Sequence, residues 1–141
     1  DIDHFKHIND HLGHASGDQA LTIVSASMIE HLRANDVAGR HGGDEFALLL
    51  RRADTTAAVS VAARIAAEVQ TRADGAKLPR LTLSFGIVQV DPRERLEDAM
   101  RRADQAMYEA KRQGRGCAVT AAGNEARPVF SESRPLGLLS A

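Results

Sequence analysis

The sequence predicts an α+β domain, because segments with helical periodicity alternate with short strand-like segments along its 141 residues. A chain of this length is enough for one domain with a real core but not for two. The helical segments carry apolar residues three or four positions apart, whereas the strand-like segments are short and bounded by glycine or proline. Around Gly42-Gly43, two strand-like segments lie close enough in sequence to form a hairpin.

The beginning of the chain predicts a strand end followed by two helices. Residues Asp1 to Asp3 look like the end of a strand, and Phe5 to Leu12 form a short helix that Gly13 stops. A second helix starts at Ser16-Gly17-Asp18. Its apolar face has helical spacing and comprises Leu21, Val24, Met28 and Leu32.

The hairpin consists of the segments Val37 to His41 and Phe46 to Leu50, joined by Gly42-Gly43-Asp44-Glu45. Glycine reaches the positive φ angles that tight turns need. The turn presents Asp44 and Glu45 where a metal ion or a phosphate-bearing ligand can approach bare backbone. Taken alone, such a turn favours an ordinary solvated hairpin, so the motifs around it decide its meaning.

The second half of the chain predicts two further helices and two strands. Asp54-Thr55-Thr56 opens an alanine-rich helix, Leu81 to Val90 is a strand between two prolines, and Arg95 to Gln113 is a long helix ended by Gly114. Cys117 to Thr120 is a short closing strand. The residues expected to face the core from the two helices are Ala58, Ala62, Ile65, Val69, Leu96, Ala99, Met100, Ala103, Ala106, Met107 and Ala110. Because residues 121–141 lack periodicity, we expect a domain over residues 1–120 and a flexible tail over 121–141.

The charge balance limits the possible partners. Lys and Arg number 18 and Asp and Glu 19, so the chain has no global basic field that would coat a nucleic acid polymer. Nucleotide recognition must therefore be local. The single cysteine, Cys117, excludes an internal disulfide framework, fits a reducing compartment and is expected to be a small core hydrophobe. No apolar run approaches the ~20 residues that span a bilayer, so we expect no membrane contact by this segment.

Several motifs occur together in a fixed order. These are Asp1-Ile2-Asp3-His4-Phe5-Lys6-His7-Ile8-Asn9-Asp10, Gly13-His14, Gly17-Asp18, Arg33-Ala34-Asn35-Asp36, Gly42 to Phe46, Leu81 to Gly86, Ala103 to Lys111 and Gly114-Arg115. In this order the motifs resemble the GGDEF domain of diguanylate cyclases, from Asp1 to about Val119. Gly116 departs from the asparagine that is usual in the family after Gly-Arg.

The resemblance implies a ferredoxin-like palm of the nucleotidyl cyclase type, with a central antiparallel sheet and flanking helices. It also implies that the preceding helix and most of the first, central strand lie upstream of Asp1, so that the fragment is truncated at its N-terminus. The activity implied is a nucleotidyltransferase reaction that condenses two GTP molecules into cyclic di-GMP and releases pyrophosphate.

The resemblance assigns the metal and catalytic positions. Asp1 and Asp44 match the metal ligands of the family, and the backbone carbonyl of Ile2 is a further candidate. The expected ion is Mg²⁺ (or Mn²⁺), which favours a few carboxylates plus substrate phosphate oxygens. Glu45 is needed for catalysis in the family, either as a metal ligand or in removing a proton.

Other positions match the substrate-binding residues of the family. Lys6, at the start of a short helix, and Lys111 and Arg115, expected in the last turn of the final helix, match phosphate-contacting positions. Asp18 matches the residue that accepts from N1–H and the 2-amino group of guanine, and Asn9 matches its partner. Helix-end charges of this kind also stabilise a helix dipole without any ligand.

The motif Arg33-x-x-Asp36 marks an inhibitory product site in the family, and Arg64 matches a further product-binding arginine. Each GTP lies on a separate domain, so the reaction implies a two-fold homodimer. The resemblance places the chain in the cytoplasm, with a parent protein that can be membrane-anchored upstream.

Two classes of function fit these residues. The first is an active diguanylate cyclase with product feedback inhibition through the Arg-x-x-Asp site. The second is a catalytically inactive receptor that binds GTP or cyclic di-GMP and passes this state to a partner. The intact turn from Gly42 to Phe46 favours the enzyme, because receptors of this type usually show a degraded turn.

Overall fold

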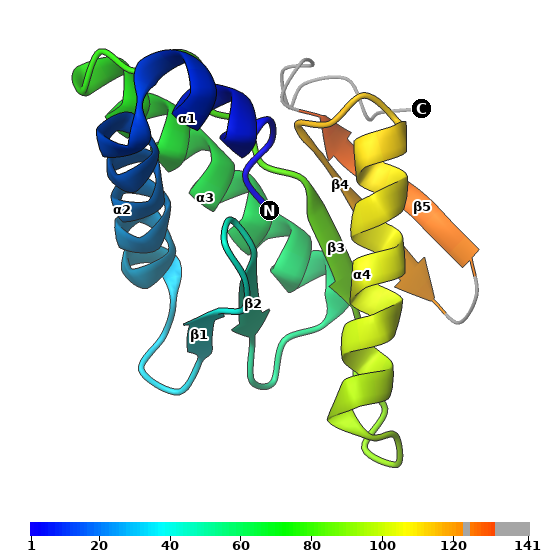
Figure 1. Ribbon diagram of the computed structural model, residues 1–141. Helices are drawn as coiled ribbons and strands as arrows, with labels where there is room; N and C mark the ends of the chain where they lie inside the picture. The colour runs from blue at the N-terminus through cyan, green and yellow to red at the C-terminus, as the bar shows by residue number, and fades with distance from the viewer. Residues whose placement is uncertain (123–124, 132–141) are drawn as a thin grey trace, which may run out of the picture.

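The computed structural model describes residues 1–122 and 125–131 of the chain. Helices and strands follow one another in the order α1, α2, β1, β2, α3, β3, α4, β4, β5 (Figure 1). The helices are α1 (Phe5–Leu12), α2 (His14–His31), α3 (Thr55–Gly75) and α4 (Leu96–Arg112). The strands are β1 (Val37–Arg40), β2 (Phe46–Leu49), β3 (Phe85–Val88), β4 (Cys117–Ala122) and β5 (Glu125–Ser131).

The helix limits agree closely with the sequence signals. Helix α1 has the predicted bounds, and α3 begins after Asp54, whose Oδ1 accepts a hydrogen bond from the backbone N–H of Ala57 at 2.8 Å. Helix α2 begins at His14, earlier than predicted, because the chain turns sharply at Gly13 with φ 82°. It also ends earlier, since Leu32 is extended with ψ 145°.

The strands form two small sheets. Strands β1 and β2 pair antiparallel across the predicted hairpin, with Arg40 opposite Phe46. In the second sheet β3 pairs parallel with β4, and β4 pairs antiparallel with β5. Strand β3 is shorter than the predicted 81–90 because the segment before it changes partner: Leu83 forms a bridge to Ile2.

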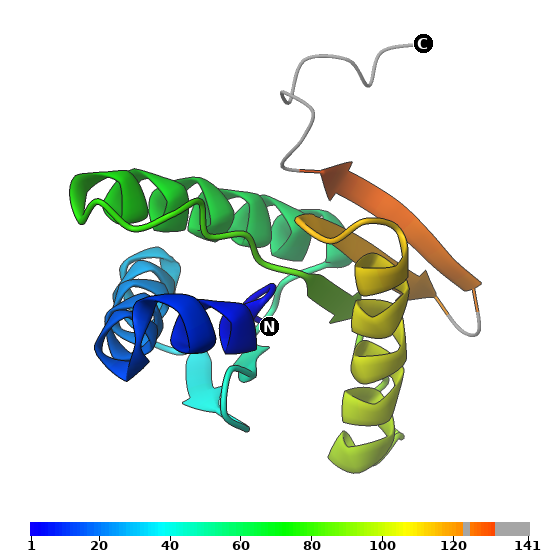
Figure 2. The same cartoon turned by 45° about the horizontal axis from the view of Figure 1, so that its top comes forward.

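The three-stranded sheet lies between helices. Figures 1 and 2 show α4 across one face of β3 and β4 and α3 behind the opposite face, with α2 beside α3 and α1 in front of α3 in the view of Figure 1. The N-terminus lies near the middle of the molecule, between the β1–β2 hairpin and β3. The architecture is α+β, with the palm-like arrangement of a nucleotidyl cyclase.

The main core joins the N-terminal segment to α2 and α3. Its largest fully enclosed side chains include Ile2, Val24, Ile65 and Leu83. A smaller cluster between α4 and β4 contains Ala106, Ala110, Cys117 and Val119. Cys117 is buried, as predicted, and its thiol contacts the carbonyl oxygen of Ala110 at 3.3 Å.

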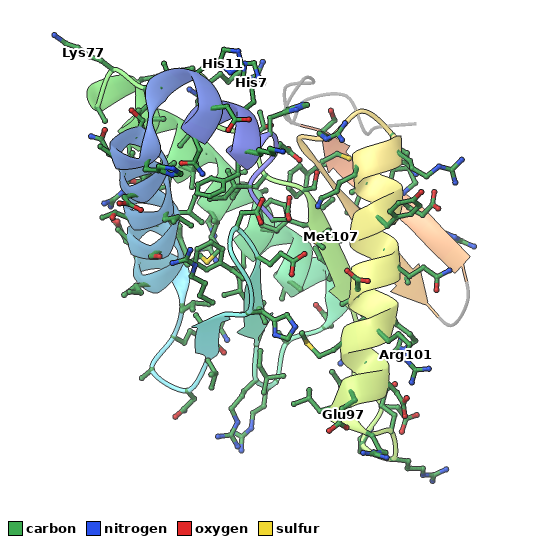
Figure 3. The ribbon with its side chains drawn as sticks, in the orientation of Figure 1. His7, His11, Lys77, Glu97, Arg101 and Met107 are labelled. Carbon is green, nitrogen blue, oxygen red and sulfur yellow. The ribbon has the colours of Figure 1, made fainter. Side chains whose placement is uncertain are left out.

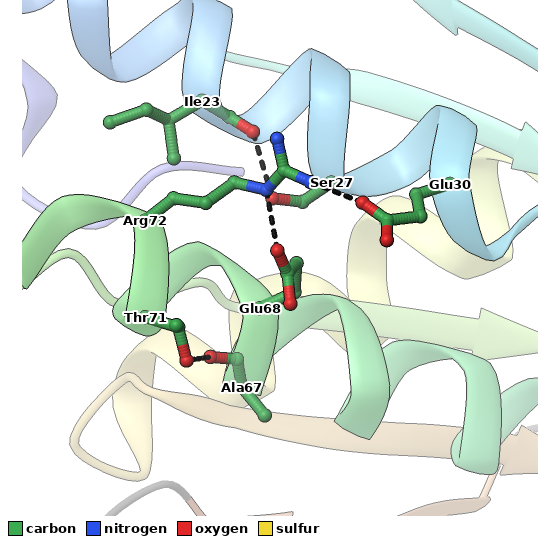
Figure 4. A network of polar contacts seen from close by, with 7 residues as sticks. All are labelled: Ile23, Ser27, Glu30, Ala67, Glu68, Thr71 and Arg72. Carbon is green, nitrogen blue, oxygen red and sulfur yellow. Dashed lines mark hydrogen bonds and ion pairs between the residues drawn. The ribbon is translucent and has the colours of Figure 1, made fainter. Parts of the chain in front are cut away.

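Helices α2 and α3 are also joined by a polar contact (Figure 4). The guanidinium of Arg72 on α3 forms ion pairs with Glu68, at 2.6 Å, and with Glu30 on α2. These side chains are partly exposed, so the pairs add little to stability by themselves. They fix the relative rotation of two helices whose apolar faces already meet.

Helix α4 packs unusually closely on β3 at Gly86. A Cβ atom at this position would lie 1.9 Å from the carbonyl oxygen of Ala103 and 2.5 Å from the backbone nitrogen of Met107. Both atoms belong to the helix backbone, which cannot move aside as a flexible side chain can. Gly86 therefore sets the distance between α4 and the sheet.

Two further sequence expectations differ from the structure. Leu96, expected in the core, is 57% exposed because α4 begins there, beyond the edge of the sheet. Residues 121–122 and 125–131, expected in a flexible tail, form the end of β4 and the strand β5. Strand β5 pairs antiparallel with β4, the strand that precedes it in sequence, with Ala122 opposite Glu125, although the segment carries no clear periodic signal. Residues 123–124 and 132–141 of the expected tail lie outside the described residues.

None of the helices in the described part of the chain combines the length and the apolar character that a membrane span requires.

The close packing at Gly86 makes a testable prediction. Gly86→Ala should lower the free energy of unfolding by about 1–3 kcal/mol, because a methyl group forces the α4 backbone away from β3. Gly75→Ala is the matched control, since a Cβ there meets nothing within 4 Å. Urea unfolding of the two variants measures the difference, and equal stabilities would contradict this account of α4 packing.

Candidate functional site

The segment Asp1 to Asp3 connects the hairpin to the segment that precedes β3. The backbone N–H of Ile2 donates to the carbonyl of Asp44 at 3.2 Å. On the other side, Asp3 donates its N–H to the carbonyl of Thr82, and the carbonyl of Asp1 accepts from the N–H of Ser84, both at 3.0 Å. The segment is therefore hydrogen-bonded on one side to the hairpin turn and on the other to the segment before β3, which agrees with the predicted strand end.

The geometry of this bridge directs the backbone of Ile2 toward the hairpin. Ile2 and Leu83 form an antiparallel pair whose flanking residues make the hydrogen bonds. In such a pair the N–H and the carbonyl of each residue point away from the opposite strand. The carbonyl of Ile2 is thus directed to the same side as its N–H, where Asp44 lies.

The hairpin turn carries Asp44 and Glu45 and is closed by backbone contacts. The carbonyl of Glu45 accepts from the N–H groups of His41 at 2.8 Å and Gly42 at 3.3 Å. The guanidinium of Arg40 donates to the carbonyls of Gly42 and Gly43. The expectation that these glycines take positive φ is wrong, since positive-φ glycines in the described chain are Gly13, Gly114 and Gly116.

Gly42 instead provides space. A Cβ at Gly42 would lie 3.0 Å from Oε2 of Glu45, so a larger residue would press on this carboxylate. Asp44 and Glu45 are both half-buried. The turn consequently holds two carboxylates close to the backbone of the N-terminal segment.

The carboxylate of Asp1 is paired with a lysine from α4. The Asp1 side chain is 5% exposed, and its Oδ2 lies 2.9 Å from Nζ of Lys111. Burial lowers the pKa of the Asp1 amino group to about 6, and the Lys111 charge lowers it too, whereas the nearby charges of Asp3, Asp44 and Glu45 raise it. The carboxylates of Asp44 and Glu45 are thus close enough to interact electrostatically with Asp1, as Lys111 does.

The sequence predicted Arg115 in the last turn of the final helix. In the structure it lies beyond the end of that helix. Helix α4 ends at Arg112, and Gly114 has φ 110°. Arg115 itself is left-handed, with φ 66°, and its N–H donates to the carbonyl of Ala110 at 3.1 Å. Its side chain is exposed and forms no ion pair with a described residue.

The candidate guanine-binding residues lie where α1 meets α2. A Cβ at Gly17, which is buried, would lie 1.9 Å from Oδ1 of Asn9. The absence of a side chain at Gly17 therefore leaves room for the Asn9 carboxamide, and exposed Asp18 follows directly. Lys6 is exposed on α1 and forms no ion pair with a described residue.

The three residues of the expected inhibitory site line one hollow of about 130 Å³. Arg33 and Asp36 come from the loop after α2, and Arg64 comes from α3. Asp36 is held by backbone donors: its Oδ2 accepts from the N–H of Arg33 at 3.0 Å and its Oδ1 from the N–H of Arg51 at 2.9 Å. These hydrogen bonds lower the pKa of Asp36, and the charge of Arg33 adds to the effect.

A second hollow, of about 340 Å³, separates the hairpin turn from α4. Its lining includes Glu45, Lys111 and Tyr108, together with Arg101 and Met107, which Figure 3 labels on α4. It opens beside the pair of Asp1 and Lys111. Glu45 of the hairpin turn thus lies across this hollow from Lys111, near the end of α4.

The described side chains include no group of three or more His, Cys, Asp or Glu residues arranged to hold a metal ion. Figure 3 shows His7 and His11 together on α1, with ring centroids 3.8 Å apart, and this pair falls short of a zinc site. A Mg²⁺ site has different needs, because this ion takes a few carboxylates and completes its shell with water and phosphate oxygens. Asp1, Asp44 and the carbonyl of Ile2 meet that description.

Asp3 and Arg40 belong to the site, although the sequence motifs assigned no role to either residue. Asp3 is 4% exposed and accepts several hydrogen bonds, and Arg40 fixes the carbonyls of the turn. The sequence did contain a signal for Asp3. Thr82 and Ser84 are two residues apart in a predicted strand, so both hydroxyls point to the same side and can donate to a buried acceptor there. No local pattern marked Arg40.

Comparison with known proteins identifies the family. The model of the family "Diguanylate cyclase, GGDEF domain" matches residues 1–117. The chain belongs to this family. Diguanylate cyclase DgcM of Escherichia coli K12 is 38% identical over 115 residues, which cover 82% of this chain and 28% of that protein. The chain thus spans about a quarter to a third of the length of this curated relative.

Solved structures agree with the family assignment. The GGDEF domain of YfiN from Pseudomonas aeruginosa is 40% identical, with a TM-score of 0.77 over 88% of this chain and 80% of that one. The coiled coil and GGDEF domain of DgcB from Caulobacter crescentus, solved in complex with c-di-GMP, is 33% identical. Its TM-score is 0.79, over 86% of this chain and 66% of that one.

The hydrogen bonds to Asp36 predict a pH-dependent contribution to stability. The pKa of Asp36 is lowered in the folded protein, so this carboxylate stabilises the fold above its ordinary pKa of 3.8. Asp36→Asn should therefore lower Tm near pH 7, and the difference from the unmodified protein should vanish as the pH falls through the lowered pKa. Thermal unfolding from pH 7 to pH 2 measures this; a Tm difference independent of pH would contradict it.

Proposed function

We propose that this chain is the catalytic domain of a diguanylate cyclase that condenses two GTP molecules into cyclic di-GMP with release of pyrophosphate. The observation that carries the proposal is the meeting of the Gly-Gly-Asp-Glu turn with the Asp1–Ile2 segment, beside a lysine from α4. This meeting occurs in a chain of the GGDEF family. Acidic groups and a cation at one place are what a nucleoside triphosphate and its metal require.

Asp1, Asp44 and the carbonyl of Ile2 would hold Mg²⁺ (or Mn²⁺). Bound there, the ion would supply charge stabilisation for the phosphates and make the attacking hydroxyl more acidic. The ammonium of Lys111 lies 2.9 Å from the buried carboxylate of Asp1 and supplies an opposite charge there. Glu45, beside Asp44, either joins the metal ligands or accepts the proton of the nucleophile.

The reaction joins the 3′-oxygen of one GTP to the α-phosphorus of the other, while the bond from that phosphorus to the β-phosphate oxygen breaks. Lys6, Lys111 and Arg115 would bind the triphosphate and the departing pyrophosphate. Asn9 and Asp18 would select guanine, since one carboxylate can accept both adjacent donors on its edge. The same step, repeated with the roles exchanged, closes the ring.

Each domain would bind one GTP, so the two active sites must face each other in a two-fold homodimer. The hollow lined by Arg33, Asp36 and Arg64 would bind the product and inhibit turnover. The arginines supply planar donors for phosphate and guanine, and Asp36 is held in place by backbone donors. The reaction would take place in the cytoplasm, where a buried free thiol such as Cys117 stays reduced.

A second candidate function is a catalytically inactive receptor of GTP or cyclic di-GMP. The hollow at Arg33 favours it, because product binding there needs none of the groups at the hairpin turn. Turnover by the purified protein separates the two functions.

The metal-binding carboxylate of the turn gives the first functional prediction. With GTP and Mg²⁺, Asp44→Asn should reduce cyclic di-GMP formation by roughly 100-fold or more, because the substituted amide cannot balance the charge of the ion. Glu97→Gln is the control, since this carboxylate is 73% exposed in the first turn of α4. Chromatography of the nucleotides measures product, and unchanged turnover by a folded Asp44→Asn would refute the cyclase assignment.

The inhibitory site gives the second functional prediction. Arg33→Ala should raise the cyclic di-GMP concentration that halves activity by about tenfold or more, the effect of losing one charge-assisted hydrogen bond. The initial rate without product should not change. Arg95→Ala, in which an arginine with a 79% exposed side chain is removed, is the control. Inhibition of Arg33→Ala at the original product concentration would show that the hollow is not the inhibitory site.

A further inference from the structure

The carboxylate of Asp3 is buried, and both of its oxygens accept hydrogen bonds. Asp3 is 4% exposed. Its Oδ1 accepts from the hydroxyl of Ser84 at 2.6 Å, and its Oδ2 accepts from the hydroxyl of Thr82 at 2.8 Å and from the backbone N–H of Gly116 at 2.9 Å. No ion pair to Asp3 occurs in the described part of the chain, and three hydrogen-bond donors stabilise its negative charge.

The bond to Gly116 joins two residues that are 113 positions apart in the sequence. Gly116 lies in the turn after α4, in which Gly114, Arg115 and Gly116 have φ angles of 110°, 66° and 54°. Arginine adopts a left-handed φ only where its surroundings hold it there. The turn is held at one end by the bond from Arg115 N–H to Ala110 and at the other by Asp3.

Asp3 therefore has two connections relevant to the site. Through the backbone it continues directly into Ile2 and Asp1, and through its side chain it holds the residue that follows Arg115. Thr82 and Ser84 fix the orientation of the carboxylate from a third segment. The side chain of Asp3 thus links the residue that follows Arg115 to the segment that contains Asp1.

We propose that Asp3 is a positioning residue that holds the Gly114–Gly116 turn, and with it Arg115, against the Asp1–Ile2 segment. This inference rests on the proposed function in so far as Arg115 binds the triphosphate of GTP. Asp3 itself touches neither substrate nor metal. It acts through the amide of Gly116, and small displacements of a binding group can cost as much as ~100-fold in rate.

The test compares Asp3→Asn, Arg115→Ala and the double variant with the unmodified protein. Asp3→Asn should raise KM for GTP at least tenfold and speed hydrogen exchange at the Gly116 amide at least tenfold. Adding Asp3→Asn to Arg115→Ala should raise KM no further, because the first change acts through the second residue. Asp54→Asn is the matched control, since Asp54 also accepts from a backbone N–H, that of Ala57, far from the site.

Two outcomes would overturn the proposal: unchanged Gly116 exchange in folded Asp3→Asn, or increases in KM that multiply in the double variant. If Asp3→Asn does not fold, Ser84→Ala removes one orienting hydroxyl and should change Gly116 exchange in the same direction. If the unmodified protein does not turn over GTP, the proposed function fails, while Gly116 exchange still decides the role of Asp3.

Discussion

The fold and the candidate site both depend on three residues, Asp1 to Asp3, that carry two carboxylates into the interior. Buried polar groups are stable only when they have partners inside the protein. Here the backbone partners come from the hairpin and from the segment before β3, and the side-chain partners come from Lys111 and the end of α4. Because the polar groups of this short segment need these partners, parts of the chain more than a hundred residues apart lie together here.

The need of buried charges for partners also explains why the candidate site contains both carboxylates and a lysine. A carboxylate that is 5% exposed, such as that of Asp1, needs a cation, and Lys111 supplies it. Lys111 can reach Asp1 because α4 packs against the backbone of β3 at Gly86. A structural requirement and the proposed phosphate binding thus use the same lysine. The hollow at Arg33, Asp36 and Arg64 is built separately, from the loop after α2 and from α3.

Signals that are local in the sequence predicted the structure well. The limits of α1 and the start of α3 follow from Gly13 and from the cap at Asp54, and the hairpin follows from the turn composition. Family resemblance, now supported by a match over residues 1–117, then assigned roles to residues far apart in the chain. Those assignments stay predictions, although Asp1 and Lys111, and separately Arg33, Asp36 and Arg64, do lie together.

Non-local features could not be predicted in this way. The shorter β3 results from a change of partner at Leu83, which forms a bridge to Ile2. Arg115 is a different case, because Gly114 is a local stop signal and the expectation that Arg115 lies in the last helical turn ignored it. Asp3 looked like part of a motif, whereas its hydrogen bonds involve residues about eighty and more than a hundred positions away.

The central claim is that the hairpin turn, the N-terminal segment and the turn after α4 form one site for a guanine nucleoside triphosphate. The most direct test titrates ¹⁵N-labelled protein with Mg²⁺ and a GTP analogue that cannot be cleaved. The account predicts that the amides of Ile2, Glu45 and Gly116 shift together, with one Kd, and that the ATP analogue has a much weaker effect. Shifts confined to the hollow around Arg33 and Arg64, or equal responses to both nucleotides, would contradict it.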